Sequence, residues 1–393
     1  MQTEQVLLAL LRNVVCGQPL PEEMKSACTE DMIEAVYNDA NRHDLAHLAG
    51  QALSKLSLPE SEGLAKCKKA TKQAIFRYMR LDMAYTQSCD ALEKAQIPFI
   101  PLKGSVLRSY YPEPWMRTSC DIDILVHPQD LNTAVEALKT SLQFTESGKG
   151  DHDISLFSPM GVHLELHYDT MPEDYIINSS DKVLAQVWDD ATPIRPGACH
   201  HKMSDGMFYF YHLAHWAKHL SINGCGIRPA LDLWVLNHCI EPDAAQRKKY
   251  LEQGELLSYG QAMERLAEVW FSQAQSDPMT EQLAQYVLGC DIYGTVEQQA
   301  LQSQRKMGGG LSYAFSRIFL PYDVIKVDYP ILRKHKWLMP FCYIVRWSKI
   351  LLRGRVGFAA KELKAIAAAP KSQWQPLKEM FLYLGIENEE TEA

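Results

Sequence analysis

Residues 121–126, with the sequence DIDILV, constrain the fold of this chain more than any other segment. The segment alternates acidic and apolar residues and then becomes wholly apolar, which is typical of a β-strand that enters a core. Side chains two apart on a strand share a face, so Asp121 and Asp123 are expected side by side, with Ile122 and Ile124 anchoring the opposite face. Two carboxylates this close repel each other unless a cation separates them, and neutralising Asp123 is expected to relieve that repulsion. The pattern therefore predicts a divalent-cation site, and Mg²⁺ or Mn²⁺ suits such hard oxygen ligands.

A second segment, residues 162–167 (VHLELH), follows the same design. It is expected to pair with residues 154–157 as a hairpin. His163, Glu165 and His167 would share one face of this strand, so Glu165 is the candidate third carboxylate of the metal site. The two histidines are interpreted as walls of the site, because Mg²⁺ prefers oxygen.

Lys103, Gly104 and Ser105 lie between a short apolar strand at 97–102 and a short helix that runs through Tyr110. Glycine lets backbone N–H groups approach a phosphate closely, and a helix N-terminus adds positive potential. A phosphate-binding turn, paired carboxylates and a third carboxylate on a later strand together indicate metal-dependent phosphoryl chemistry.

The chain is expected to be an α+β protein, in which helical regions flank a small mixed sheet. Helical spacing dominates residues 1–96, and strands and helices alternate over 97–195. Helices return over 200–304, and residues 305–393 form a basic, C-terminal helical segment that ends in an acidic tail. Three consecutive glycines at 308–310 predict a flexible joint.

Charge and cysteine content exclude several classes of protein. The formal net charge of −8 argues against a uniformly basic nucleic-acid binder, although residues 305–364 carry 13 Lys or Arg against three acids. The ten cysteines include no CxxC pair and are expected as reduced thiols in a cytoplasmic protein. No secretory signal is expected, and the most apolar segment, residues 337–352, is too short to span a bilayer.

Several short motifs resemble, in order, the signature of the polymerase-beta-type nucleotidyltransferase superfamily. Within it, the chain is most similar to a bacterial group of uncharacterised nucleotidyltransferases with a Leu-Lys-Gly and an Asp-x-Asp motif. The matching residues are Leu102 to Ser105, Tyr111-Pro112, Arg117, residues 121–126, His212, His215, Lys218, His219, Asp232-Leu233 and, weakly, residues 317–321.

The resemblance implies transfer of an NMP group from an NTP to an acceptor hydroxyl, with release of pyrophosphate. By this likeness Asp121, Asp123 and Glu165 would be the catalytic metal ligands, and Gly104 and Ser105 would hold the β- and γ-phosphates. Two departures stand out: fifteen residues separate Ser105 from Asp121, and the third carboxylate is Glu where relatives more often have Asp. Nucleotide-binding candidates also include Lys103 and Arg117, and the candidate substrate contacts are His167, His215, Lys218 and His219.

Alternatives stay open. His212, His215 and His219 share one helical face, where packing or substrate contact is favoured over zinc. Arg117 either contacts the triphosphate or screens the aspartates. The basic stretch fits a solvated face, an interdomain surface or a platform for a polyanion. The chain as a whole fits an enzyme, a catalytically silent nucleotide- or partner-binding module, or a protein that contacts a membrane surface through 337–355. A small molecule, a protein and an RNA end all remain as acceptors.

Overall fold

The structure, a computed structural model, describes residues 1–172, 176–222, 224–239, 241–291, 319–320, 322, 325, 329–333, 335–352 and 371–386. The chain divides into two compact units, one of Met1–Lys218 with Cys225–Ile292 and one of His219–Gly224 with Tyr293–Ala393. The predicted joint at 308–310, much of the basic stretch and the acidic end lie outside the described residues.

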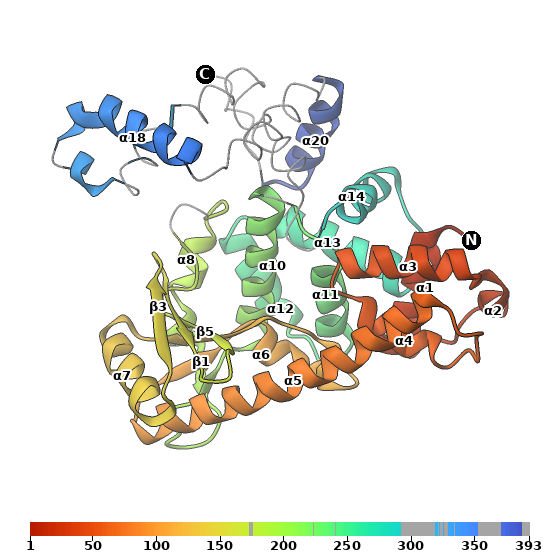
Figure 1. Cartoon of the computed structure of the whole chain (residues 1–393), viewed down its shortest axis with the longest axis horizontal. Coiled ribbons are helices and arrows are strands. Elements are labelled where there is room, and N and C mark those ends of the chain that lie inside the picture. The colour runs from red at the N-terminus through yellow and green to blue at the C-terminus, as the bar shows by residue number, and fades with distance from the viewer. Residues whose placement is uncertain are drawn as a thin grey trace. The chain divides into compact units, whose positions relative to one another are not determined.

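The first unit contains a five-stranded mixed sheet in the order β1-β2-β5-β4-β3. Only the central pair, β2 with β5, is parallel, and the other neighbours are antiparallel. Figure 1 shows this sheet with helices around it, which confirms the predicted α+β class. The strands are β1 (Phe99–Pro101), β2 (Asp121–Val126), β3 (Thr145–Lys149), β4 (Asp153–Phe157) and β5 (His163–His167).

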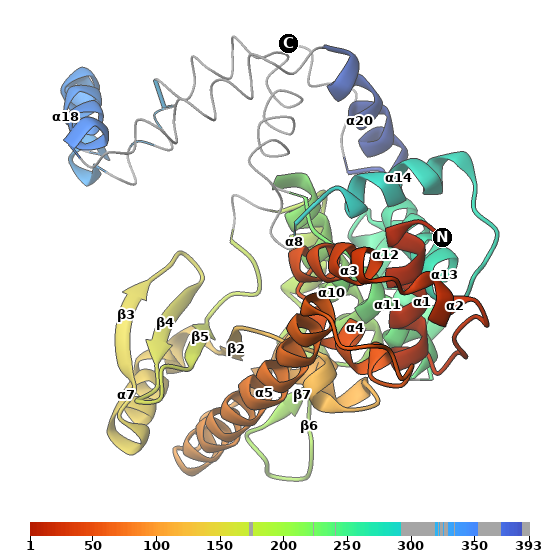
Figure 2. The ribbon, with the colours of Figure 1, turned by 45° about the vertical axis from the view of Figure 1, so that its right-hand side comes forward.

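One face of the sheet is apolar and packs against two helices, α5 (Glu62–Lys94) and α7 (Leu131–Leu142), which are seen beside the strands in Figure 2. Ile122 and Ile124 of β2 join Leu164 of β5 in this core, and all three are fully buried. The alternation that predicted an apolar face is therefore confirmed, and the acidic residues of β2 and β5 must point to the opposite face.

The remaining elements of the first unit are helices and one small hairpin. The hairpin strands β6 (Thr192–Pro193) and β7 (His201–Lys202) pair with each other, and Phe99 of β1 bridges to His200. The N-terminal helices are α1 (Thr3–Val15), α2 (Met24–Ala27), α3 (Glu30–Arg42) and α4 (Ala46–Leu53). Short helical segments follow as α6 (Gly104–Leu107), η1 (Arg108–Tyr110), η2 (Pro114–Met116), η3 (Pro128–Asp130), α8 (Ser180–Leu184) and α9 (Val187–Asp190). The later helices are α10 (Asp205–Ile222), α11 (Arg228–His238), α12 (Ala244–Gln253), α13 (Leu257–Phe271) and α14 (Pro278–Leu288), of which α10 ends in the second unit.

The second unit has its own small core in the described residues. Its elements are η5 (Pro330–Arg333), η6 (Lys336–Leu338), α18 (Met339–Leu352) and α20 (Lys371–Tyr383). Cys342 and Tyr343 of α18 pack with Leu320, Ile325 and Leu332. No described helix, in either unit, has the length and apolarity that crossing a membrane requires.

Candidate functional site

Three carboxylates meet on the polar face of the sheet, because β2 and β5 run parallel and in register. Asp121 pairs with His163 and Asp123 with Glu165 in this register. Asp123 is 2% exposed, whereas Asp121 and Glu165 are partly open to solvent. The structure thus brings together the three acids singled out from the sequence.

The Lys103 ammonium lies between two of these carboxylates. Its Nζ is 2.7 Å from Asp123 Oδ1 and 4.0 Å from Glu165 Oε2. Lys103 has φ +46° and ψ −122°, a backbone conformation that side-chain-bearing residues seldom adopt. Such strain costs on the order of 1–3 kcal/mol and persists only where surrounding contacts hold it. The contacts of Lys103 here include the ion pair with Asp123 and the backbone hydrogen bonds that Lys103 O accepts from Val106 and Leu107.

His167 completes the buried end of the cluster and is 1% exposed. Its Nε2 donates to Asp123 Oδ1 at 3.0 Å and lies 3.4 Å from Glu165 Oε2. The other ring nitrogen, Nδ1, is buried and has no partner within the described part of the chain. His163, by contrast, lies 3.1 Å from Ser155 Oγ and stacks on Phe157.

The two aspartates differ in their electrostatic environment. Burial and the charge of Asp123 raise the pKa of Asp121. Burial would also raise the pKa of Asp123, but Lys103 and the His167 hydrogen bond outweigh it, and that pKa lies well below its usual range. The repulsion expected from the sequence therefore destabilises the charged form of Asp121, because Lys103 and His167 already stabilise the charged form of Asp123.

The side chains present suit a divalent cation. Two overlapping groups place ligating atoms within 4.8 Å of one another, Asp121 with His163 and Glu165, and Asp123 with Glu165 and His167. Carboxylates dominate both groups, as hard cations require. The ammonium of Lys103 between Asp123 and Glu165 shows, independently, that this position attracts a positive charge.

The turn before α6 is fastened to the start of β2 by a buried arginine. Arg108 Nε donates to Gly104 O at 2.9 Å, and Arg108 Nη2 donates to Ser119 Oγ at the same distance. Ser119 Oγ in turn donates to Asp121 O at 3.1 Å. A Cβ on Gly104 would come within 3.1 Å of the Ser119 side chain, so glycine allows this close approach. The chain that carries Ser105 is thereby held to the chain that carries Asp121.

Ser105 faces a cavity of about 620 Å³. Its Oγ is buried without a hydrogen-bond partner in the described residues, and none of the three carboxylates is among the lining residues. The lining also includes Tyr78 and Tyr85 of α5, Lys202 of β7 and Phe208 of α10. The side chains of Lys103 and Ser105 thus lie at two different sites, since Lys103 contacts the carboxylates and Ser105 lines the cavity.

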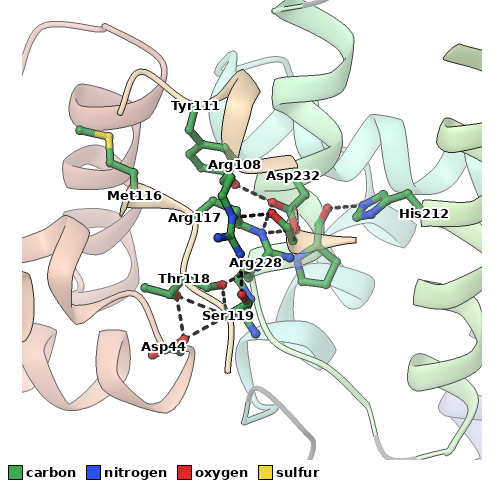
Figure 3. Close-up of polar contacts among 12 residues, drawn as sticks. Asp44, Arg108, Tyr111, Met116, Arg117, Thr118, Ser119, His212, Arg228 and Asp232 are labelled. Atoms are coloured by element: carbon green, nitrogen blue, oxygen red, sulfur yellow. Dashed lines mark hydrogen bonds and ion pairs between the residues drawn. The ribbon is translucent and has the colours of Figure 1, made fainter. Parts of the chain in front are cut away.

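Arg117 is paired with Asp232 of α11, as Figure 3 shows. Arg117 Nε donates to both carboxylate oxygens, at 2.7 and 3.0 Å, and Tyr111 OH donates to Asp232 Oδ1 at 2.7 Å. Asp232 is 1% exposed, so the pair is shielded from water. Three of the residues that resemble the superfamily signature therefore form one contact, which fastens the segment before β2 to α11.

The same segment is held a second time by Thr118. Its Oγ1 donates to Asp44 Oδ2 at 2.8 Å, and Arg228 Nη1 donates to the same oxygen at 2.9 Å. The long connection between Ser105 and Asp121 is thus tied to the N-terminal helices as well as to α11.

Helix α10 contributes a further positive charge, Lys218, which interacts electrostatically with Lys103, Glu165 and Asp123. Burial and the neighbouring charge of Lys103 lower the pKa of Lys218 to about 8, with Glu165 and Asp123 acting in the opposite direction.

The histidines of α10 have other neighbours. His215 lies beside Tyr211, with ring centroids 6.1 Å apart. His219 belongs to the second compact unit. His212 Nε2 is 3.1 Å from Pro229 O. Neither group of ligating side chains found among the described residues contains a histidine of α10.

Two neighbours of the site were missed at the sequence level. Burial raises the pKa of Tyr211, the charge of Lys103 lowers it and that of Asp123 raises it. These electrostatic interactions place Tyr211 beside the cluster. Its spacing of four and seven residues from His215 and Lys218 was a usable signal, since all three share a helical face. His152, whose ring lies 5.2 Å from that of His167, sits in a turn region that carried no such signal.

This geometry, a mixed sheet that presents three carboxylates beside a glycine turn and two lysines, is typical of enzymes that transfer phosphate-containing groups. The family model described as "Uncharacterised nucleotidyltransferase" matches residues 29–272, which is more than half of the 393-residue chain. The chain therefore belongs to this family of nucleotidyltransferases. Among curated proteins, none matches it.

Proposed function

We propose that the protein is a metal-dependent nucleotidyltransferase that moves an NMP group from an NTP to an acceptor hydroxyl. In this reaction the acceptor hydroxyl loses its proton to solvent and its oxygen bonds to the α-phosphorus. The bond between the α-phosphorus and the oxygen bridging to the β-phosphate breaks, and pyrophosphate leaves. The observation that carries the proposal is the register of β2 with β5, which sets Asp123 opposite Glu165 and Asp121 two residues away. Family membership supports the same reaction class.

Asp121, Asp123 and Glu165 would hold the cation, with His167 orienting Asp123 through its hydrogen bond. Bound Mg²⁺ or Mn²⁺ would supply charge neutralisation on the leaving pyrophosphate and activation of the acceptor hydroxyl. We assign no catalytic proton transfer to His167, because its donor bond to Asp123 supports a positioning role.

The triphosphate would lie over the turn at Lys103 and Gly104. The Gly104 N–H makes no hydrogen bond in the described residues, whereas the Ser105 N–H already donates to Leu102 O. Lys103 and Lys218 would move their ammonium groups onto phosphate oxygens when a cation takes the place between the carboxylates. Catalysis would rest on this positioning and charge stabilisation.

The cavity beside Ser105 would take the part of a substrate that lies beyond the phosphates. Tyr78, Tyr85 and Phe208 supply aromatic walls, and Lys202 supplies a cation at the rim. Its volume of about 620 Å³ falls within the range of ordinary small-molecule sites.

A catalytically silent nucleotide-binding module is the second candidate, and Lys103 is the observation that favours it. An ammonium 2.7 Å from Asp123 neutralises part of the charge that would otherwise recruit a metal. The full set of three carboxylates, which a silent module has no need to retain, supports the enzyme.

Purified protein incubated with cell extract, Mg²⁺ and NTPs labelled at either the α- or the γ-phosphate tests the proposal. Nucleotidyl transfer predicts an acceptor labelled from α-label only, and loss of that label in Asp121→Asn. Label from the γ-position would indicate phosphoryl transfer instead, and no label from any NTP would support the silent module.

A further inference from the structure

An exposed apolar face lies on α18, in the second unit. Trp337, in the turn just before the helix, and Phe341, Ile344 and Val345 follow one another at spacings of four, three and one residues. Their exposed fractions are 70%, 60%, 60% and 45%, in that order. This spacing places the four side chains along one stripe of the helix.

The opposite face of α18 is already in use. Cys342 and Tyr343 are buried in the small core of this unit, and the Tyr343 hydroxyl donates to Leu320 O. Rotation of the helix to hide the exposed stripe would expose these residues. The stripe is therefore a surface of the part of this unit that the structure describes.

The charge around the stripe has one sign. The described residues 329–333 and 335–352 include four Lys or Arg and no Asp or Glu. Lys336 and Lys349, near the two ends of the stripe, make no ion pair with a carboxylate in the described residues, and their ammonium groups lie over the rings of Tyr322 and Tyr329, at 4.3 and 5.1 Å from the centroids. The partner of this face must therefore be apolar and negatively charged.

We propose that α18 binds the surface of an anionic phospholipid membrane and lies in its plane. Aliphatic Ile344 and Val345 need an apolar medium, which acyl chains offer and a phosphodiester backbone does not. Trp337 suits the headgroup level, and the basic residues attract anionic headgroups. The apolar stripe covers about one side of a 14-residue helix, which fits partial insertion rather than spanning. This surface is independent of the proposed transfer reaction.

Flotation of the full-length protein with vesicles tests the proposal. The wild type is expected to float with vesicles of phosphatidylcholine mixed with phosphatidylglycerol, much less with phosphatidylcholine alone, and less as salt is raised. Phe341→Asp with Ile344→Asp should lower partitioning by at least about tenfold. The matched control is Phe76→Asp with Met79→Asp on α5, whose side chains are each 62% exposed, and it should leave partitioning unchanged.

A second variant, which removes two lysines, tests the proposal even if Phe341→Asp with Ile344→Asp does not fold. Lys336→Gln with Lys349→Gln leaves the apolar stripe intact and should weaken both the binding to anionic vesicles and its salt dependence. Absence of flotation, flotation that ignores lipid charge, or equal loss in the α5 control would overturn the proposal. So would a wild-type dimer that dissociates on Phe341→Asp without any vesicle binding, since the occupant would then be a second copy.

Discussion

At the residue scale, the two aspartates of β2 should respond oppositely to neutralisation in metal-free protein. The pKa of Asp121 is raised by burial and by Asp123, so Asp121→Asn should stabilise the fold by roughly 1 kcal/mol. The pKa of Asp123 is lowered despite burial, because Lys103 and His167 bind its charged form, so Asp123→Asn should destabilise by roughly 2–3 kcal/mol. Urea unfolding in EDTA measures both. Equal shifts of the same sign in the two variants would contradict this difference.

Lys103 is predicted to compete with the metal in the absence of nucleotide. Lys103→Met removes a positive charge 2.7 Å from Asp123, so Mg²⁺ affinity without NTP should rise about tenfold. The NTP KM should also rise, because a phosphate contact is lost. Titration of Mg²⁺ into wild type and variant checks the first effect and steady-state kinetics the second. Weaker Mg²⁺ binding in Lys103→Met would mean that the lysine supports the metal site rather than blocking it.

The sequence alone predicted which side chains share a face, but not which of them touch. Strand periodicity sufficed for Asp121, Asp123 and Glu165, since it depends only on local geometry. The contact of Lys103 with Asp123 depends on a positive φ and on a turn packing against β2, and Arg117 meets Asp232 across 115 residues. Such contacts follow from tertiary packing, which no local pattern contains.

At the element scale, the pairing of Arg117 with Asp232 should fasten the segment before β2 to α11. Asp232→Ala leaves a guanidinium with an 11% exposed side chain unpaired, and about 3–5 kcal/mol of stability should be lost. Tyr111→Phe removes one hydrogen bond to the same carboxylate and should cost only about 1 kcal/mol. Chemical denaturation of both variants, with Arg117→Met and the double variant completing a cycle, measures the coupling. A cost for Asp232→Ala no larger than for Tyr111→Phe would show that the ion pair does not fasten these elements.

Elements with strong periodicity were predicted closely and weakly patterned ones were missed. The range of β2 matches that expected, and the hairpin of β4 with β5 was also predicted. Strand β3 was missed because its sequence, TESGK, is polar and wholly exposed at the sheet edge. Helix α5 (Glu62–Lys94) lies within residues 1–96, where helical spacing predicted helices, and its first turns bury small residues such as Gly63.

At the scale of the whole molecule, stability should fall in mild acid because two buried histidines fold in the neutral form. Burial, the largest effect, lowers the pKa of both His43 and His47 to about 4, against about 6.5 in an unfolded chain. Below pH ~6.5 the unfolded state then binds more protons than the folded state. The stability that the two neutral histidines contribute is therefore fully present above pH ~6.5 and is lost as the pH falls towards 4.

His47→Gln tests this directly, because glutamine keeps a donor for Met116 O, which His47 Nε2 reaches at 2.8 Å. Between pH 7 and pH 5, the free energy of unfolding should fall by about 2 kcal/mol less in the variant than in the wild type. An unchanged slope in His47→Gln would show that this imidazole does not fold in the neutral form.

The measurement that tests the central claim most directly is calorimetry of NTP binding in Mg²⁺ and in EDTA. If Asp121, Asp123 and Glu165 hold a metal against the triphosphate, wild type should bind NTP much more tightly with Mg²⁺. Asp121→Asn should lose most of that gain while remaining folded, with circular dichroism as the check. Equal NTP affinity in Mg²⁺ and EDTA, or a full Mg²⁺ effect in Asp121→Asn, would contradict the carboxylate site proposed for this nucleotidyltransferase.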